Sequence, residues 1–531
     1  MKYNASLLSQ TKCEVLFDCQ KHGLLKIVKF VKSFYSLAKL KAMLPIDFSI
    51  DLHTHPAYKP FGKSFGGTNP GAQSSRSRDK NNLYYYDPPS LSDKLINYLG
   101  GLTKFSQANL TAAIYGKLWV MAVSVGSIEK GFFDNKLGTS LFSDLIGDFA
   151  SGIGKDRINV IQNIDDYWQD LQQELSFWGT LNEQIIQIDG KKYTYKWVNN
   201  FSALEQVMLR NADKINNNLS NEPLVIALIP TIEGMHFLNT GLGKPINEPE
   251  VLNHAHALKT MTPTPWFVSL THHFNNQICG HSKSLKGIMA KCLDQSAGLN
   301  TGFTNLGLKV LDILLDNTGG QHRILIDIKH LSPLGRKEYF DLLQTKYLGV
   351  PIIISHGVCN GLPTHGANFS LYPDLGADFE KGEINFYDDE IILMAKSGGI
   401  MGLQLDERRI ANEEKLKRTK HSAFRNKIMH YRSELLWNQI QYIGELLDKN
   451  GLYAWGNIAI GSDYDGIVDP INSFWTAEQY PDLKSFVERY AYTYFKEKSH
   501  RLKNSFNKIE ADELVQNIFQ NNAWRFFQQW F

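Results

Sequence analysis

The chain has 531 residues, of which 43% are apolar and 21% charged, values typical of a globular protein with a large buried core. Its 56 basic and 54 acidic residues leave a net charge of +2. Such a balance excludes a strong overall field that would favour nucleic acid or an anionic membrane surface as a partner.

The five cysteines are scattered, without CxxC pairs or the density of a disulfide scaffold, which indicates a reducing compartment. The first residues lack the apolar core and the small-residue cleavage site of a secretory signal. No apolar run reaches the roughly eighteen residues of a membrane span. We therefore expect a cytoplasmic protein without a membrane span.

Residues 1–46 precede the first predicted strand and are expected to form an N-terminal helical extension. Within them, Leu24–Lys41 has the pattern of a basic amphipathic helix. Its apolar stripe can pack on the rest of the protein or lie on a membrane surface.

Residues 47–531 are predicted to form an α/β fold, a TIM-type (β/α)8 barrel with large insertions. Helical patterns separate the later strands at Ser332–Lys346, Asp388–Lys396 and Ser433–Lys449. The eight predicted strands are apolar runs, several of them rich in β-branched residues: Asp47–His53, Ala112–Val123, Leu224–Pro230, Trp266–Thr271, Arg323–Lys329, Pro351–Ser355, Gly399–Leu405 and Asn457–Gly461.

Three connections, near residues 56–110, 126–221 and 360–383, are longer than ordinary loops and are predicted to be insertions on a single barrel. Part of the first, Phe61–Lys80, is rich in glycine and serine. It fits either a lid over the barrel or a solvated loop without a role.

The first predicted strand ends in two histidines, His53 and His55. Because side chains alternate along a strand, both share the face of Asp51. Two imidazoles at one strand end suit a zinc-like ion, and Asp51 is placed to hold a histidine ring in the required tautomer. Taken alone, the two histidines also fit an exposed loop.

His330 and His356 end the fifth and sixth predicted strands, each continuing a row of alternate isoleucines. A lone histidine at such a position is more often a core or surface residue. However, the carboxyl ends of barrel strands meet at one rim, so we expect these two to converge with the histidines of the first strand as metal ligands.

Carboxylates complete the predicted site. Glu233, at the end of the third strand, can bridge two cations through its two oxygens, or can be an ordinary acid at a helix N-terminus. Asp463, after the eighth strand, is placed as a general base. His272, after the fourth strand, can donate to a developing oxyanion, line a pocket, or be structural. This set predicts metal-dependent amide hydrolysis at a two-metal site.

Five motifs in the order IEG (Glu233), LTHHFNN (His272), DIKHLS (His330), PIIISHG (His356) and IGSDYDG (Asp463) resemble those of the renal (membrane) dipeptidase family of zinc peptidases, in the amidohydrolase superfamily. The resemblance implies cleavage of a dipeptide or related small amide. It also implies two zinc ions bridged by Glu233, with one ion on His53 and His55 and the other on His330 and His356. Asp463 would then manage protons, and His272 would contact the substrate.

The chain departs from the family pattern in three ways, one of which is its large insertions, which can close the pocket differently and admit another amide. The family usually has His-x-Asp in the first motif, where this chain has His55, which changes the charge at the metal. The family also has an arginine after the sixth-strand histidine to grip the substrate carboxylate, and none occurs between His356 and Lys381. Arg408 and Arg409 can replace it, since a guanidinium fork suits a carboxylate, or can be ordinary surface residues.

Two alternatives remain open. A cyclic amidohydrolase or lactonase relative would bridge its metals with a carboxylated lysine, for which Lys329 is the candidate; strand alternation turns Lys329 away from His330, which favours Glu233. The second alternative is a barrel that binds metal but has no catalytic activity. A small-molecule substrate and no nucleic acid are expected as partners, and a homodimer is one option for the assembly.

Overall fold

The computed structural model describes residues 46–66, 80–100, 103–126, 128–133, 152–219, 221–320, 322–418 and 424–531. The predicted N-terminal helical extension lies outside these residues except for Ile46, as do residues 67–79 of the glycine- and serine-rich segment. The structural statements that follow concern the described residues.

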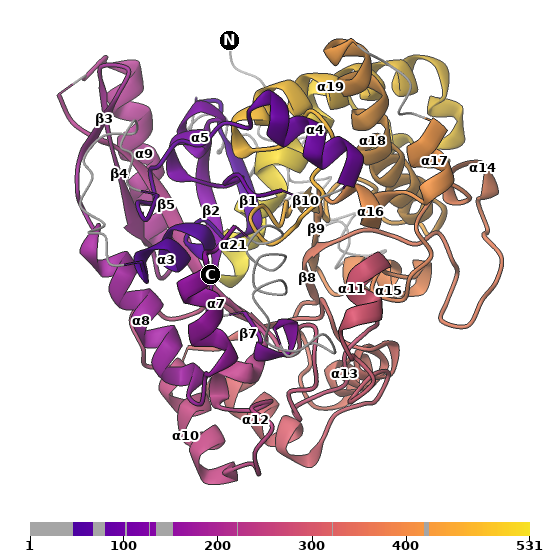
Figure 1. The fold of residues 1–531 in the computed structure, drawn as a ribbon. Helices are drawn as coiled ribbons and strands as arrows, with labels where there is room; N and C mark the ends of the chain where they lie inside the picture. Colours follow the sequence, from indigo (N-terminus) through magenta and orange to yellow (C-terminus); the bar gives the residue numbers. More distant parts are fainter. Residues whose placement is uncertain are drawn as a thin grey trace, which may run out of the picture.

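Eight parallel strands close into a barrel, which confirms the predicted TIM-type (β/α)8 fold (Figure 1). Their order around the barrel is β2-β1-β10-β9-β8-β7-β6-β5, and pairing of β2 with β5 closes it. The strands are β1 Ser49–Thr54, β2 Leu118–Val125, β5 Leu224–Glu233, β6 Phe267–Ser269, β7 Leu325–Asp327, β8 Ile353–Gly357, β9 Ile400–Leu403 and β10 Ile458–Ile460.

Helices surround the barrel, and the three predicted from the sequence are present as α13 (Pro333–Thr345), α15 (Asp388–Lys396) and α18 (Arg425–Lys449). No helix in the described part of the chain is long and apolar enough to cross a membrane. Besides α13, α15 and α18, the described α-helices are α3 Tyr58–Ser64, α4 Leu91–Gly100, α5 Leu110–Tyr115, α7 Lys155–Gln162, α8 Tyr167–Thr180, α9 Phe201–Asn216, α10 Glu248–Leu258, α11 Gly287–Cys292, α12 Asn305–Leu315, α14 Pro373–Gly376, α16 Glu407–Ile410, α17 Glu413–Arg418, α19 Tyr480–Glu497, α20 Ala511–Gln516 and α21 Asn522–Trp530.

The C-terminal helix α21 covers the amino-terminal end of the barrel. Its Trp524 packs edge-on against Phe48, and its Phe527 packs against Trp266. Phe48 and Trp266 directly precede β1 and β6, so these contacts lie at the end opposite to the strands' carboxyl termini. The carboxyl rim is therefore the end left free for a site.

The insertion predicted at 126–221 contains secondary structure of its own. Strands β3 (Ile186–Ile188) and β4 (Lys191–Trp197) form an antiparallel pair, and β4 runs parallel to the first half of β5. They extend the sheet outside the closed barrel. Helices α7, α8 and α9 occupy the rest of the described insertion.

The second predicted strand, Ala112–Val123, is wrong in its first part, which forms the short helix α5. The Asn109 side chain accepts a hydrogen bond from the Ala112 backbone N–H at 2.8 Å and so caps this helix, which ends at Gly116. A short apolar run fits a helix or a strand equally well, and here the cap decides.

Candidate metal centre

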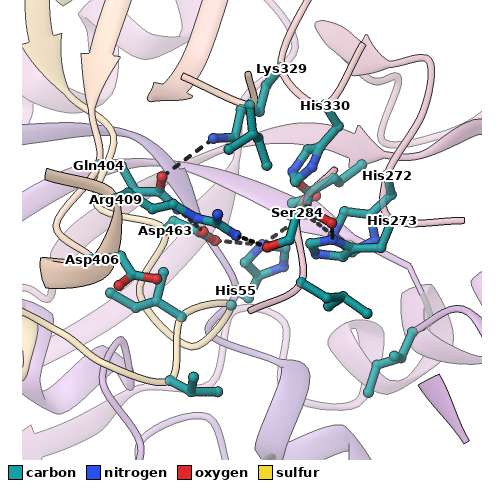
Figure 2. A pocket seen from close by; sticks show the side chains of 18 of the residues that line it. His55, His272, His273, Ser284, Lys329, His330, Gln404, Asp406, Arg409 and Asp463 are labelled. Carbon is teal, nitrogen blue, oxygen red and sulfur yellow. Dashed lines mark hydrogen bonds and ion pairs between the residues drawn. The ribbon is translucent and has the colours of Figure 1, made fainter. Parts of the chain in front are cut away.

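A cavity opens at the carboxyl rim of the barrel and is lined by histidines, carboxylates and cationic side chains (Figure 2). Residues at the ends of seven barrel strands contribute to it. Among them are His55, Glu233, His272, His330, Gln404 and Asp463.

Glu233 lies at the centre of the predicted ligands, at the end of β5. Its Oε2 is 3.5 Å from His53 Nε2 and 3.3 Å from His55 Nε2. Its other oxygen, Oε1, is 2.9 Å from His330 Nε2 and 3.5 Å from His356 Nε2. Each carboxylate oxygen thus faces one pair of histidines, as a carboxylate shared between two ions would.

His53 and His55 come from one strand end, and their Nε2 atoms are 3.0 Å apart. Strand alternation directs both rings toward the same side, as predicted. His53 is fully buried, whereas His55 forms part of the cavity wall. Together with Glu233 they place three potential ligand atoms within 4.8 Å of one another.

His330 and His356 face the other oxygen of Glu233, and these three also place ligand atoms within 4.8 Å of one another. Strand β7 ends at Asp327, and His330 has φ of +67°, a backbone conformation that non-glycine residues seldom adopt. Asp463 has φ of +60°. Backbone strain of this kind is concentrated at functional sites.

Asp463 lies beside both histidine pairs. Its Oδ1 is 3.4 Å from His55 Nε2, and its Oδ2 is 3.7 Å from His356 Nε2. The Gln404 amide donates a hydrogen bond of 2.7 Å to Oδ2. The carboxylate is therefore oriented by Gln404 and lies next to His53, His55 and His356.

The pKa shifts divide the site into anionic and neutral donors. Burial opposes the ionisation of Glu233, yet His272, His53 and the hydrogen bond with His330 hold its pKa well below the ordinary value. Burial lowers the pKa of His330 to about 3 and that of His356 well below its usual range, so both imidazoles stay neutral. Against the opposing effect of burial, contacts with Asp463 and Glu233 raise the pKa of His55 to about 10.

These donors fit divalent metal ions. Neutral imidazoles and an ionised carboxylate are the protonation states that metal ligands require. Buried ring nitrogens of His53 (Nδ1), His330 (Nδ1) and His356 (Nε2) lack a hydrogen-bond partner in the described structure, and for His356 it is the atom that faces Glu233. The positive charge that the carboxylates favour at His55 is one that a metal ion supplies.

His272 follows β6 and is held over the rim by a residue that the sequence did not point to. Glu129 Oε2 is 3.0 Å from His272 Nδ1, and Glu129 also accepts backbone N–H bonds from His273 and Phe274. The Nε2 atom of His272 is then 3.6 Å from Glu233 Oε2. Glu129 belongs to the predicted insertion at 126–221 and stands in no motif, so no sequence signal would have found it.

The two candidate arginines differ in their surroundings. Arg408, whose side chain is 36% exposed, is bound to Asp406, with 2.9 Å from NH2 to Oδ2. Arg409 is only 9% exposed, lines the cavity and donates a hydrogen bond of 2.6 Å to the Ser284 carbonyl. Its NH1 group has no hydrogen-bond partner among the described residues.

Lys329, which strand alternation is predicted to turn away from His330, also lines the cavity. The strand ends at Asp327, and strand alternation no longer governs the two residues beyond Ile328. Lys329 is fully buried, and its Nζ lies 3.4 Å from Gln404 Oε1. Burial and the nearby Arg409 lower the pKa of Lys329 to about 7.

Asp51 does not contact a histidine ring, contrary to the prediction from the sequence. It accepts hydrogen bonds from the His53 backbone N–H, the Ser462 backbone and hydroxyl, and the Tyr480 hydroxyl. Asp327 on β7 has the same kind of environment. Both carboxylates tie barrel strands together one level below the rim.

Comparisons with solved structures found chains that are similar to this one. The chain is similar to a probable dipeptidase, PvdM, from Pseudomonas aeruginosa, with 11% identity, a TM-score of 0.49 and coverage of 93% of this chain and 98% of the other. A metallopeptidase from Rhodobacter sphaeroides, solved with a phosphinate mimic of the dipeptide L-Ala-D-Ala, has 11% identity, a TM-score of 0.45 and coverage of 91% and 99%. No protein-family model and no curated protein matches the chain.

Proposed function

We propose that this protein is a metal-dependent hydrolase that cleaves a dipeptide or a related small amide, with two zinc ions in the cavity at the barrel rim. The observation that carries the proposal is the position of Glu233, whose two oxygens each face a pair of histidines. Ions held by these residues would supply an activated water and polarise the scissile carbonyl.

Each predicted residue has a proposed role. His53 and His55 would hold one ion, and His330 and His356 would hold the other. Glu233 would bind both ions. Asp463, adjacent to both groups and oriented by Gln404, would accept the proton of the attacking water and pass it to the leaving nitrogen.

His272 would donate a hydrogen bond to the oxygen of the tetrahedral intermediate. Its Nδ1 is engaged by Glu129, which leaves Nε2 on the side of Glu233 and the cavity. A donor fixed before the reaction begins stabilises developing negative charge more effectively than one that must reorient.

The proposal is tested by metal analysis of protein purified without chelators, together with hydrolysis of a dipeptide library. We expect about two zinc ions per chain and turnover of at least some dipeptides, abolished by a chelator and restored by zinc. Bound zinc without turnover on any amide would instead support a non-catalytic metal-binding barrel.

A second candidate, a cyclic amidohydrolase or lactonase relative, is favoured by one observation, the presence of Lys329 in the cavity wall. In that class a carboxylated lysine would bridge the ions. A Glu233→Ala variant that retains both ions and hydrolyses cyclic amides would support it.

A further inference from the structure

Two cationic side chains on one wall of the cavity have no part in the proposed cleavage. Lys329 follows β7, and Arg409 belongs to α16 after β9, yet both lie beside Gln404 and Asp463 (Figure 2). They lie across the cavity from His272 and His273. This wall is where the part of a substrate beyond the scissile bond can extend.

Neither cation is neutralised by the protein. No carboxylate within the described ranges forms an ion pair with Lys329, whose Nζ contacts the neutral Gln404 amide oxygen. Arg409 donates to the Ser284 carbonyl and has one NH1 group without a partner.

The acidic residues of this wall have other partners. Asp406 binds the neighbouring Arg408 through both of its oxygens. Asp463 accepts the amide N–H of Gln404 and faces His55 and His356. The cavity wall therefore holds two basic side chains for which the described residues offer no ion-pair partner.

Buried charges are normally paired, because removing them from water is costly. Lys329 is fully buried and Arg409 nearly so, and both reach the cavity where a ligand would lie. A dipeptide with an uncharged second residue brings one carboxylate to this wall and matches one cation. The second cation is matched only by a second negative group.

We propose that Lys329 and Arg409 form an acid-binding subsite and that the preferred substrates are dipeptides whose second residue is aspartate or glutamate. Arg409, with its planar fork, binds the terminal carboxylate, and Lys329 binds the side-chain carboxylate. Gln404 anchors Lys329 through its oxygen and Asp463 through its nitrogen, so it links this subsite to the proton carrier. The inference rests on the proposed function, since it assumes that a dipeptide occupies the cavity.

The test uses zinc-loaded full-length protein and the isosteric pair Ala-Glu and Ala-Gln, each with an L- or a D-residue in the second position. These substrates share the terminal carboxylate and differ only in the side-chain charge. We expect kcat/KM to be at least about tenfold higher for Ala-Glu. A ratio within twofold in the wild-type protein would overturn the proposal, and this measurement needs no variant.

Lys329→Met removes the charge while keeping an unbranched apolar stem. We expect the Glu-to-Gln ratio to fall to within about twofold because the loss falls on Ala-Glu, and Lys329→Arg to restore part of the preference. An unchanged ratio would remove Lys329 from the subsite. An equal loss on both substrates would show that Lys329 binds the shared carboxylate, which also overturns the second-charge proposal.

Lys286→Met is the matched control, because Lys286 also lines the cavity but already pairs with Glu380 at 2.7 Å. It should leave the Glu-to-Gln ratio unchanged. If the zinc-loaded wild type cleaves no dipeptide, the proposed function fails and calorimetry tests the subsite separately. Tighter binding of Ala-Glu than Ala-Gln would support the subsite, and equal binding would overturn it.

Discussion

Four buried carboxylates at the carboxyl end of the barrel form two sets with opposite surroundings. Asp51 and Asp327 each accept hydrogen bonds from two hydroxyl groups and two backbone N–H groups. Glu233 and Asp463, one level higher, face imidazole rings instead. The same residue types thus serve to join strands at one level and to gather ligands at the next.

The electrostatics of the two levels differ accordingly. Burial raises the pKa of Asp51 to about 6, despite the hydrogen bonds it accepts from Ser462 and Tyr480. The histidines around Glu233 outweigh burial and keep its pKa well below the ordinary value. The lower level is satisfied by the protein alone, whereas the upper level holds charge available to a ligand.

The largest expected effect is on metal binding, and it comes from changing a carboxylate of the upper level only. Glu233→Gln removes the charge that both histidine pairs face, so we expect loss of bound metal and of dipeptide hydrolysis to background, with little change in the stability of the metal-free protein. Metal content by mass spectrometry and urea denaturation in chelator measure the two quantities. Full metal content in the variant would contradict the bridging role.

Asp463→Asn should lower kcat by about 10²- to 10⁴-fold while metal remains bound, because the amide cannot accept the proton of water. Steady-state kinetics at matched zinc content measure this effect. Loss of metal equal to that in Glu233→Gln would make Asp463 a ligand instead of a proton carrier.

Asp327→Ala should act on stability first. It leaves the hydroxyl groups of Ser269 and Ser355 and two backbone N–H groups without their acceptor, which should reduce the free energy of unfolding by about 3 kcal/mol. Urea denaturation of metal-free protein measures the loss. Ser269→Ala, which removes one donor, is the milder control at about 1 kcal/mol. Unchanged stability in Asp327→Ala would contradict the conclusion that the lower-level carboxylates hold the barrel strands together.

The lower level should also show a pH dependence, which arises at Asp51. Its folded-state pKa of about 6 lies above the ordinary 3.8, so the folded protein binds this proton more tightly and loses stability as pH rises from about 4 to 6. Asp51→Asn cannot lose the proton. The variant should therefore gain up to about 3 kcal/mol relative to the wild type between pH 4 and pH 7. Denaturation curves of both metal-free proteins at several pH values measure the gain, and a constant difference would contradict the expectation.

The barrel and most of the site could be predicted because both follow from strand periodicity. Alternation along β1 brings His53 and His55 to one side, and closure of parallel strands brings Glu233, His330 and His356 to the same rim. The predicted helices between the later strands were also correct, since their apolar spacing is regular.

Other features could not be predicted because they depend on where a regular element stops. The direction of Lys329 follows from the end of β7 at Asp327, and the short helix α5 follows from its cap at Asn109. Glu129 contacts His272 across 143 positions of sequence, a contact that no local pattern encodes.

The amino-acid sequence by itself determined the barrel and the rim on which the histidines meet, because these depend on residue spacing alone. Only the tertiary structure decided which carboxylates face imidazoles, which are satisfied by hydroxyl groups, and which cations remain without an anionic partner. Those distinctions arise from burial and from contacts between distant segments, and neither is present in the order of residues along the chain.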